Sequence, residues 1–225
     1  MEDSKTLAND DYTPLFKIKR IIYLICKRIG DILVSLIGLV LLIPITIIIK
    51  IAYMCTGDFH KIIFTQDRIG LNGKHFEFYK FRSMVPNADE VLFKALAKDK
   101  KLAEEYARNK KLKNDPRITK IGRIIRKASI DETPQFINIF LGDMSLVGNR
   151  PYLPREMKDM GKAYNEIIKI KPGLTGYWQT SGRSDLSFKK RIELEIYYSK
   201  HAGFVLDTKI FFKTFKIVIC GKGAD

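Results

Sequence analysis

Residues 32–49 read ILVSLIGLVLLIPITIII and contain no charged side chain. A run of this length is at the lower limit for crossing the hydrocarbon core of a bilayer, which is about 30 Å thick. A helix that is apolar on every face is typical of a membrane segment and unusual in a water-soluble core. A cleavable signal peptide does not fit, because the run contains Pro44 and no small-residue cleavage motif follows it.

Basic residues lie on both sides of this run. Lys27 and Arg28 precede it, and Lys50 and Lys61 follow it. Positive flanks favour the cytoplasmic side, so a segment that enters and leaves on one side satisfies both flanks. Pro44 supplies the break, because proline lacks the N–H group that a helix needs. The sequence therefore favours a re-entrant helix-break-helix, and a proline-kinked helix that crosses the membrane is the alternative that the residues leave open.

Two further stretches suit the water–lipid boundary. Residues 14–28 mix apolar and basic positions, and residues 203–219 place three lysines at helical spacing among phenylalanine and isoleucine. Such a lysine stripe is typical of a helix in the headgroup layer, although the second stretch fits a partly buried core helix equally well. We expect a tail and interfacial helix over 1–28, a re-entrant helix over 29–54, and a cytoplasmic domain with a C-terminal interfacial helix over 55–225.

Length and charge bound the remaining possibilities. The 225 residues allow one globular domain beside the membrane segment. Forty Lys and Arg against 25 Asp and Glu give a net charge of +15, which predicts a phosphate-bearing partner: nucleic acid, anionic lipid or a phosphorylated small molecule. The cysteines Cys26, Cys55 and Cys220 match neither a disulfide framework nor a zinc motif, so we expect free thiols in a reducing compartment.

Residues 64–81 predict a β-hairpin, because two β-rich runs flank a turn that contains Asn-Gly. Alternation in the second run puts Phe76, Phe78, Lys80 and Arg82 on one face. A buried face that ends in two cations indicates a strand that emerges into a charged site. The expected fold class is therefore α+β and mostly helical, with a re-entrant membrane helix, amphipathic interfacial helices and a small antiparallel hairpin.

Asp131 and Glu132 are adjacent carboxylates in a basic stretch. Ser129 and Glu132 match a capping box, which is the structural interpretation. A helix that begins at Pro134 with Thr133 as its N-cap fits better, and it places both carboxylates just before a helix N-terminus, where anions are stabilised. One carboxylate can bind Mg²⁺, a cation that prefers oxygen ligands, and the other can attack phosphorus.

Several further side chains are candidates for binding an anionic substrate. Guanidinium groups hold phosphate in bidentate geometry, which makes Arg126, Arg150 and Arg183 candidates, although each is otherwise an ordinary surface arginine. Tyr177 and Trp178 either stack on a base or fill the core. The sequence contains no Gly-rich nucleotide-binding motif, no HExxH and no GxSxG.

Three strings, taken together, resemble one family. KFRSM (80–84), ASIDETPQFINIFLGDMSLVGNRP (128–151) and KPGLTGYWQTSGR (171–183) are similar to the bacterial sugar transferases. These are the monotopic phosphoglycosyl transferases that start capsule, exopolysaccharide and O-antigen assembly. The resemblance runs from about residue 18 to the C-terminus, and the ordered set of motifs is specific. The chain resembles the minimal catalytic form, without the additional N-terminal membrane helices of longer members.

The resemblance implies an activity and a site. A sugar 1-phosphate, with galactose or glucose expected, moves from a UDP-sugar to undecaprenyl phosphate, and UMP is released. In the family pattern Asp131 is the nucleophile that forms a covalent phosphosugar intermediate, and Glu132 binds Mg²⁺. The positions that bind substrate fall on Lys80, Arg82, Arg126, Arg150, Pro151, Gln179 and Arg183. The break in the membrane helix falls on Pro44, where Ile43 replaces the serine that is common in the family.

The resemblance also implies a location and partners. It predicts a monotopic protein of the bacterial cytoplasmic membrane that contacts inner-membrane lipid, faces the cytoplasm, binds no nucleic acid and is compatible with a homo-oligomer. A basic, membrane-tethered protein that binds anionic lipid or nucleic acid explains the net charge but not the Asp131–Glu132 pair. A glycosyltransferase that moves only the sugar is a third hypothesis, and it would release UDP rather than UMP.

Overall fold

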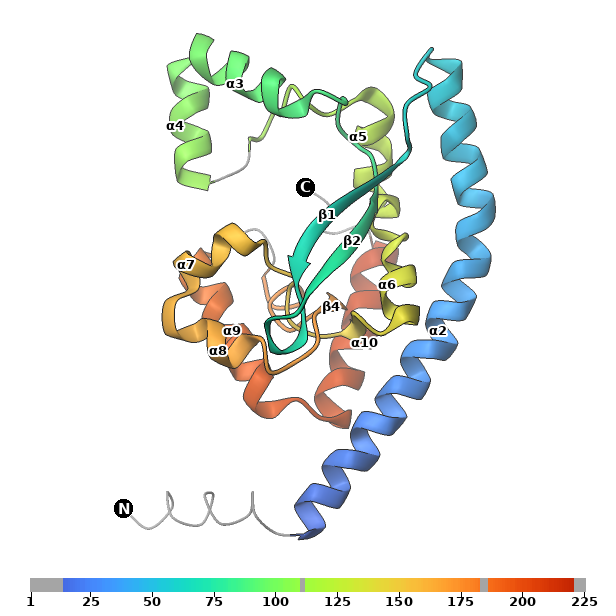
Figure 1. Ribbon diagram of the computed structural model, residues 1–225, viewed down its shortest axis with the longest axis vertical. Coiled ribbons are helices and arrows are strands. Elements are labelled where there is room, and N and C mark those ends of the chain that lie inside the picture. The colour runs from blue at the N-terminus through green and yellow to red at the C-terminus, as the bar shows by residue number, and fades with distance from the viewer. Residues whose placement is uncertain (1–13, 110–111, 183–185, 221–225) are drawn as a thin grey trace. The chain divides into compact units, whose positions relative to one another are not determined.

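The computed structural model describes residues 14–109, 112–182 and 186–220, and these are mostly helical (Figure 1). The helices are α2 (Pro14–Cys55), α3 (Ala88–Lys98), α4 (Lys100–Asn109), α5 (Lys120–Lys127), α6 (Gln135–Leu141), α7 (Met157–Met160), α8 (Tyr164–Ile167), α9 (Phe188–His201) and α10 (Phe204–Cys220). The strands are β1 (Ile63–Ile69), β2 (His75–Phe81), β3 (Ser145–Val147) and β4 (Gly173–Thr175). The predicted α+β class with a helical majority is confirmed.

The described chain divides into two compact units. The first unit holds α2 up to Val40, residues Gln66–Phe78 around the tip of the hairpin, and everything from Gln135 onward. The second unit holds Leu41–Thr65 and Tyr79–Pro134. The chain therefore passes from one unit to the other within α2 and within both strands of the hairpin.

Helix α2 contains the apolar run and continues on both sides of it. Within the described ranges it is the one helix that is long and apolar enough to cross a membrane, and its exposed side chains include Ile37 and Ile48. The predicted break at Pro44 is not confirmed, because the helix runs through this proline. A proline inside a helix removes a single backbone hydrogen bond, and this alone does not require the helix to end. The predicted boundary between residues 28 and 29 also lies inside α2.

The predicted hairpin is confirmed as the antiparallel pair β1–β2. Its turn is a short 3₁₀ segment, η1 (Leu71–Gly73), in which Asn72 has a φ of 54°, a backbone conformation that asparagine tolerates better than most residues. In the first unit, the predicted inward face of β2 packs Phe76 and Phe78 against Ile139 and Met144. These contacts join the hairpin to α6 and to the segment that follows it.

A parallel pair, β3–β4, is a feature that the sequence did not predict as a sheet. Ser145 lies opposite Gly173, and Val147 lies opposite Thr175. The next residue, Gly148, runs so close to the backbone around Gly173 that a Cβ on either glycine would collide with the other chain segment. Helix α10 packs beside both strands, next to β4 in Figure 1, and it buries Ile210 together with Val147 in a small core.

Two basic side chains of α2 bind the rest of the first unit. Lys27 forms an ion pair with Asp207 of α10 and donates to the carbonyl oxygen of Val147 at 2.8 Å. Arg28 donates from Nη1 to the carbonyl oxygen of Ile139 at 2.7 Å and from Nη2 to that of Phe140 at 2.8 Å. These carbonyl groups lie in the last turn of α6, where a helix lacks backbone donors and a cation is stabilising.

Asp31 completes this set of contacts one turn further along α2. It is 4% exposed, and its Oδ1 accepts hydrogen bonds from the Ser145 hydroxyl at 3.0 Å and from the Leu146 amide at 2.8 Å. We call Lys27, Arg28 and Asp31 the polar latch. The latch fixes the start of the apolar run of α2 to β3, α6 and α10, so these charges have a structural role within the first unit.

Helix α5 supplies a direct test of packing in the second unit. Gly122 of α5 lies against the Ser83 carbonyl group, and a Cβ at this position would collide with it. We expect Gly122→Ala to destabilise the protein by about 2 kcal/mol, because the clash forces backbone movement. For a chain of this size the melting temperature of the detergent-solubilised protein should fall by roughly 5 °C.

Gly30→Ala is the matched control, because a Cβ on Gly30 has no atom within 4 Å. It should leave the melting temperature unchanged or raise it slightly, since alanine favours the helical conformation. Equal melting temperatures for the two variants would show that the packing of α5 against Ser83 is wrong.

Candidate active site

The adjacent carboxylates lie on a short turn of the second unit. After α5 ends, Ser129 takes a left-handed conformation with a φ of 54°, and the 3₁₀ turn η2 (Ile130–Glu132) carries both acidic side chains. The predicted helix start is shifted by one residue, because α6 begins at Gln135. Thr133 does not act as an N-cap: its hydroxyl donates to the carbonyl oxygen of Ile130 at 2.8 Å and closes the turn.

Two predicted basic residues accompany the carboxylates. Lys80, at the end of β2, places Nζ 2.8 Å from Glu132 Oε1 and 4.0 Å from Asp131 Oδ2. Arg126, in the last turn of α5, donates from Nε to the Ser83 hydroxyl at 2.8 Å, and its charge acts on Asp131. The structure therefore brings together four of the predicted site residues, Lys80, Arg126, Asp131 and Glu132.

The two carboxylates differ in their access to water. The Asp131 side chain is 11% exposed, whereas the Glu132 side chain is 43% exposed. Burial raises the pKa of Asp131 above its ordinary value, and the charge of Glu132 acts in the same direction. Lys80 and Arg126 oppose this shift and lower the pKa. Asp131 is thus a poorly hydrated carboxylate beside cations, and Glu132 is a carboxylate that a solvated cation can reach.

Arg82 has a structural position. It is buried, and both oxygens of Asp58 accept from its Nη2 at 3.0 and 2.9 Å. Its Nε donates to the carbonyl oxygen of Lys61 at 2.8 Å, and its guanidinium lies over the ring of Tyr53. This arginine joins the end of β2 to the end of α2, and the predicted role in substrate binding stays a prediction.

Arg150 and Pro151 lie in the loop that follows β3 in the first unit. The Arg150 side chain is exposed, and its backbone amide donates to Glu195 Oε1 at 2.8 Å. Pro151 is buried, and its carbonyl oxygen accepts from Arg68 at 2.9 Å. The loop is therefore held by its backbone, which leaves the guanidinium of Arg150 directed to the surface.

The remaining predicted residues follow β4. Gln179 has a buried Oε1 without a hydrogen-bond partner in the described part of the chain. Trp178 is buried, which agrees with a core position, and Arg191 lies over its ring. Arg183 lies outside the described residues.

Sequence reasoning missed Glu195 of α9. It is 1% exposed, and burial raises its pKa to about 8 despite the hydrogen bond from the Arg150 amide. Tyr152 and Trp178 also interact with this carboxyl group. A signal was present in the sequence, because Glu195 lies three residues before the buried Tyr198 and thus on the inward face of α9.

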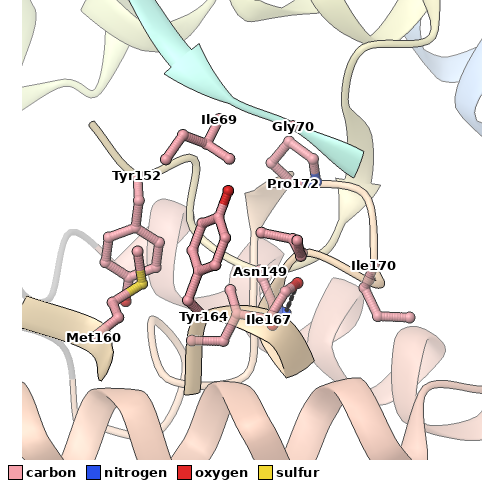
Figure 2. A pocket seen from close by; sticks show the side chains of 10 residues that line it. Ile69, Gly70, Asn149, Tyr152, Met160, Tyr164, Ile167, Ile170 and Pro172 are labelled. Carbon is pink, nitrogen blue, oxygen red and sulfur yellow. Dashed lines mark hydrogen bonds between the residues drawn. The ribbon is translucent and has the colours of Figure 1, made fainter. Parts of the chain in front are cut away.

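The cavity in Figure 2 is small. It lies in the first unit between Ile69, Tyr152, Met160 and Tyr164, and its volume is about 10 Å³. This volume corresponds to a single water molecule, and the lining is mostly apolar, with Asn149, Tyr152 and Tyr164 as its polar members. The carboxylates of η2 are not part of this lining.

The burial of Asp131 predicts a pH-dependent cost in stability. A raised pKa in the folded state means that folding favours the protonated acid, so the wild type loses stability as pH rises through that pKa. Asparagine resembles the protonated acid at every pH. We expect Asp131→Asn to have a higher melting temperature than the wild type at pH 8, and the difference to disappear as pH falls through the ordinary aspartate range near 3.8. A difference that stays constant with pH would contradict this account.

Comparison with known proteins identifies the family. The family model described as "Bacterial sugar transferase" matches residues 22–221. Undecaprenyl-phosphate galactose phosphotransferase of Salmonella typhimurium is 43% identical over 198 residues, which are 88% of this chain and 41% of that protein. UDP-glucose:undecaprenyl-phosphate glucose-1-phosphate transferase of Klebsiella pneumoniae is 36% identical over 203 residues, which are 86% of this chain and 40% of that protein.

A shorter relative covers the same region. Exopolysaccharide production protein ExoY of Sinorhizobium fredii is 36% identical over 200 residues, which are 89% of this chain and 88% of that protein. The chain spans less than half the length of the Salmonella and Klebsiella relatives but most of the length of this one. The match to the family model and the similarity to ExoY together show that the chain belongs to the bacterial sugar transferase family.

Proposed function

We propose that the protein transfers a hexose 1-phosphate from a UDP-sugar to undecaprenyl phosphate and thereby starts the assembly of an exopolysaccharide or capsule. The observation that carries this proposal is the position of Asp131 on η2, buried and yet close to Lys80 and within the field of Arg126. Membership of the bacterial sugar transferase family supports it. The names of the Salmonella and Klebsiella relatives support galactose or glucose as the sugar.

Asp131 is the proposed nucleophile. An oxygen of its carboxylate attacks the β-phosphorus of the UDP-sugar, and the bond from this phosphorus to the bridging oxygen breaks. UMP leaves with that oxygen and the bonding electron pair. An oxygen of the lipid phosphate then attacks the same phosphorus and releases Asp131. Covalent catalysis of this kind divides one difficult transfer between two bulky anions into two easier displacements.

The burial of Asp131 supports this role in two ways. A carboxylate with few water contacts loses little hydration when it attacks, and a shielded acyl phosphate is protected from hydrolysis. Lys80 and Arg126 are fixed by Glu132 and Ser83 respectively, so positive charge is in place before negative charge develops on the transferring phosphate. The predicted roles of Arg150, Pro151, Gln179 and Arg183 in substrate binding stay predictions.

Glu132 is the proposed ligand for Mg²⁺. This cation is typically bound by one or two carboxylates together with substrate phosphates and water, and the described residues contain no cluster of three or more candidate ligands. The exposed Glu132 beside Asp131 supplies the carboxylate that such a site needs. Binding of the metal would require Glu132 to give up its ion pair with Lys80 or to share its carboxylate between Lys80 and the metal. When bound, the metal would neutralise charge on the diphosphate.

The membrane segment is part of the proposal. The basic flanks favour a run whose two ends both stay on the cytoplasmic side. Because α2 is continuous through Pro44, the proposal requires the helix to bend at this proline within the bilayer. This arrangement holds the catalytic residues at the level of a lipid phosphate. Two other functions compete with this proposal: binding of anions by a membrane-tethered protein, and transfer of the sugar without its phosphate. Both predict a different result when adduct formation and UMP release are measured.

The central prediction concerns a covalent adduct. Incubation with UDP-glucose or UDP-galactose alone should add one phosphohexose group to the wild type, visible by intact mass spectrometry after an acid quench. Asp131→Asn should form no adduct, and its release of UMP in the presence of undecaprenyl phosphate should fall by about a thousandfold or more, because the nucleophile is missing.

The control for this experiment is Asp159→Asn, which removes an exposed carboxylate from α7 and should retain full activity. Release of UDP in place of UMP would reject phosphosugar transfer. Unchanged turnover in Asp131→Asn would reject the nucleophile and favour the binding protein.

A second prediction concerns the topology of α2. Single cysteines at Lys17 and at Phe59 lie on opposite sides of the uncharged run, and both side chains are exposed. In a cysteine-free background, we expect neither position to react with a membrane-impermeant maleimide on intact cells, and both to react after lysis. Labelling of one position on intact cells would show that α2 crosses the membrane.

A further inference from the structure

We propose that Arg28 and Lys171 bind the phosphate group of a membrane lipid beside Gly142. Both residues belong to the first unit, and neither has a role in the proposed transfer reaction. The inference depends on the membrane position of α2 and not on the catalytic function of Asp131.

The two cations are close together. A Cβ built on Gly142 would lie 3.4 Å from Nη2 of Arg28 and 3.6 Å from Nζ of Lys171. The two nitrogens are therefore at most 7.0 Å apart, and two oxygens of a single phosphate group can contact both across this separation. Gly142 has a φ of +94°, and its missing side chain leaves the space between the two cations open.

Lys171 lacks a partner of its own. The residue is half-buried, and within the described part of the chain its ammonium group has neither a hydrogen bond nor an ion pair. Burial lowers its pKa, and the adjacent charge of Arg28 lowers it further, while Asp31 and Asp143 act in the opposite direction. The Asp31 carboxylate already accepts from Ser145 and Leu146. Within the described residues neither Asp31 nor Asp143 forms an ion pair with Lys171, so the two adjacent, partly buried cations lack an anion in direct contact with both.

The position of Arg28 is fixed in the absence of any ligand. Its guanidinium donates to the carbonyl oxygens of Ile139 and Phe140, which leaves other N–H groups of the same guanidinium for an anion. A preorganised donor loses little side-chain entropy when a ligand binds. Replacing Arg28 would leave both carbonyl groups unpaired, so Lys171 is the better residue for a test.

The surroundings indicate a lipid rather than a soluble anion. Phe140 and Leu141, immediately before Gly142, are 42% and 62% exposed. Ile29 and Leu33 of α2 are 53% and 58% exposed, and they follow Arg28 at the start of the uncharged run. Apolar side chains beside two cations match a lipid whose acyl chains contact the former while its phosphate contacts the latter.

The test is lipid binding by the intact protein. Phosphatidylglycerol or undecaprenyl phosphate is titrated into the detergent-solubilised protein, and the rise in melting temperature gives an apparent affinity. Lys171→Gln should bind about tenfold more weakly, because one charge-assisted hydrogen bond is lost. Lys171→Arg should retain binding. Lys169→Gln is the matched control, since Lys169 is exposed and already paired with Glu166 at 2.7 Å, and its affinity should equal that of the wild type.

Each outcome decides the proposal. A Lys171-dependent shift with phosphatidylglycerol identifies a bilayer phospholipid, and one with undecaprenyl phosphate alone identifies the acceptor lipid; both support the site. Equal affinities for Lys171→Gln and Lys169→Gln, loss of binding in Lys171→Arg, or the same shift with inorganic phosphate would overturn it. Without lipid, Lys171→Gln should be at least as stable as the wild type, because repulsion from Arg28 is removed.

Discussion

A charge that is removed from water needs an opposite charge or hydrogen bonds at close range, and the structure of both units depends on this constraint. In the first unit it produces the polar latch, in which Lys27, Arg28 and Asp31 of α2 are each satisfied by groups on α10, α6 or β3. In the second unit it joins Arg82 to Asp58. Helix α2 and the strands are therefore held to their neighbours by specific polar contacts as well as by packing.

Asp131 meets this constraint only in part. Its carboxylate is buried and approaches Lys80 at 4.0 Å, a longer separation than the 2.8 Å between Lys80 and Glu132. The raised pKa of Asp131 expresses this incomplete compensation. An arrangement of this kind costs stability and is typical of functional sites, where a group is held ready for chemistry and not for the best fold. A phosphate group bound beside the carboxylates would be stabilised by the positive charges of Lys80 and Arg126.

Local patterns in the sequence were sufficient to predict several secondary-structure elements. The uncharged run predicted the long apolar helix, and Asn-Gly between two β-rich runs predicted the hairpin, because both signals depend on neighbours along the chain. The parallel pair β3–β4 was not predicted as a sheet, since its strands have three residues each and are separated by 25 intervening residues. Strands this short and this far apart in the chain leave no periodic pattern of apolar residues that would predict their pairing. The continuity of α2 through Pro44 was not predicted either, because the loss of one backbone hydrogen bond does not by itself end a helix.

In the candidate site, too, local sequence identified some residues, whereas the surroundings of others depend on the tertiary structure. Motif strings grouped Lys80, Arg126, Asp131 and Glu132, and the structure places these side chains near one another; their roles stay predictions. The alternation that put Arg82 on the same face as Lys80 could not reveal that Asp58 and Tyr53 already surround its guanidinium. Glu195 escaped notice because a glutamate on a charged helix usually faces water, and only the tertiary structure shows its burial beneath the loop of Arg150.

Exchange of labelled UMP into the donor tests the claim that Asp131 carries the phosphosugar most directly. Radiolabelled UMP is mixed with an unlabelled UDP-sugar and the protein, and no polyprenyl phosphate is present. A covalent intermediate makes the first step reversible by itself, so the account predicts that label enters the UDP-sugar pool with the wild type and not with Asp131→Asn. Absence of exchange in a preparation that completes transfer when lipid is added would contradict the account, because both substrates would then have to react in a single displacement.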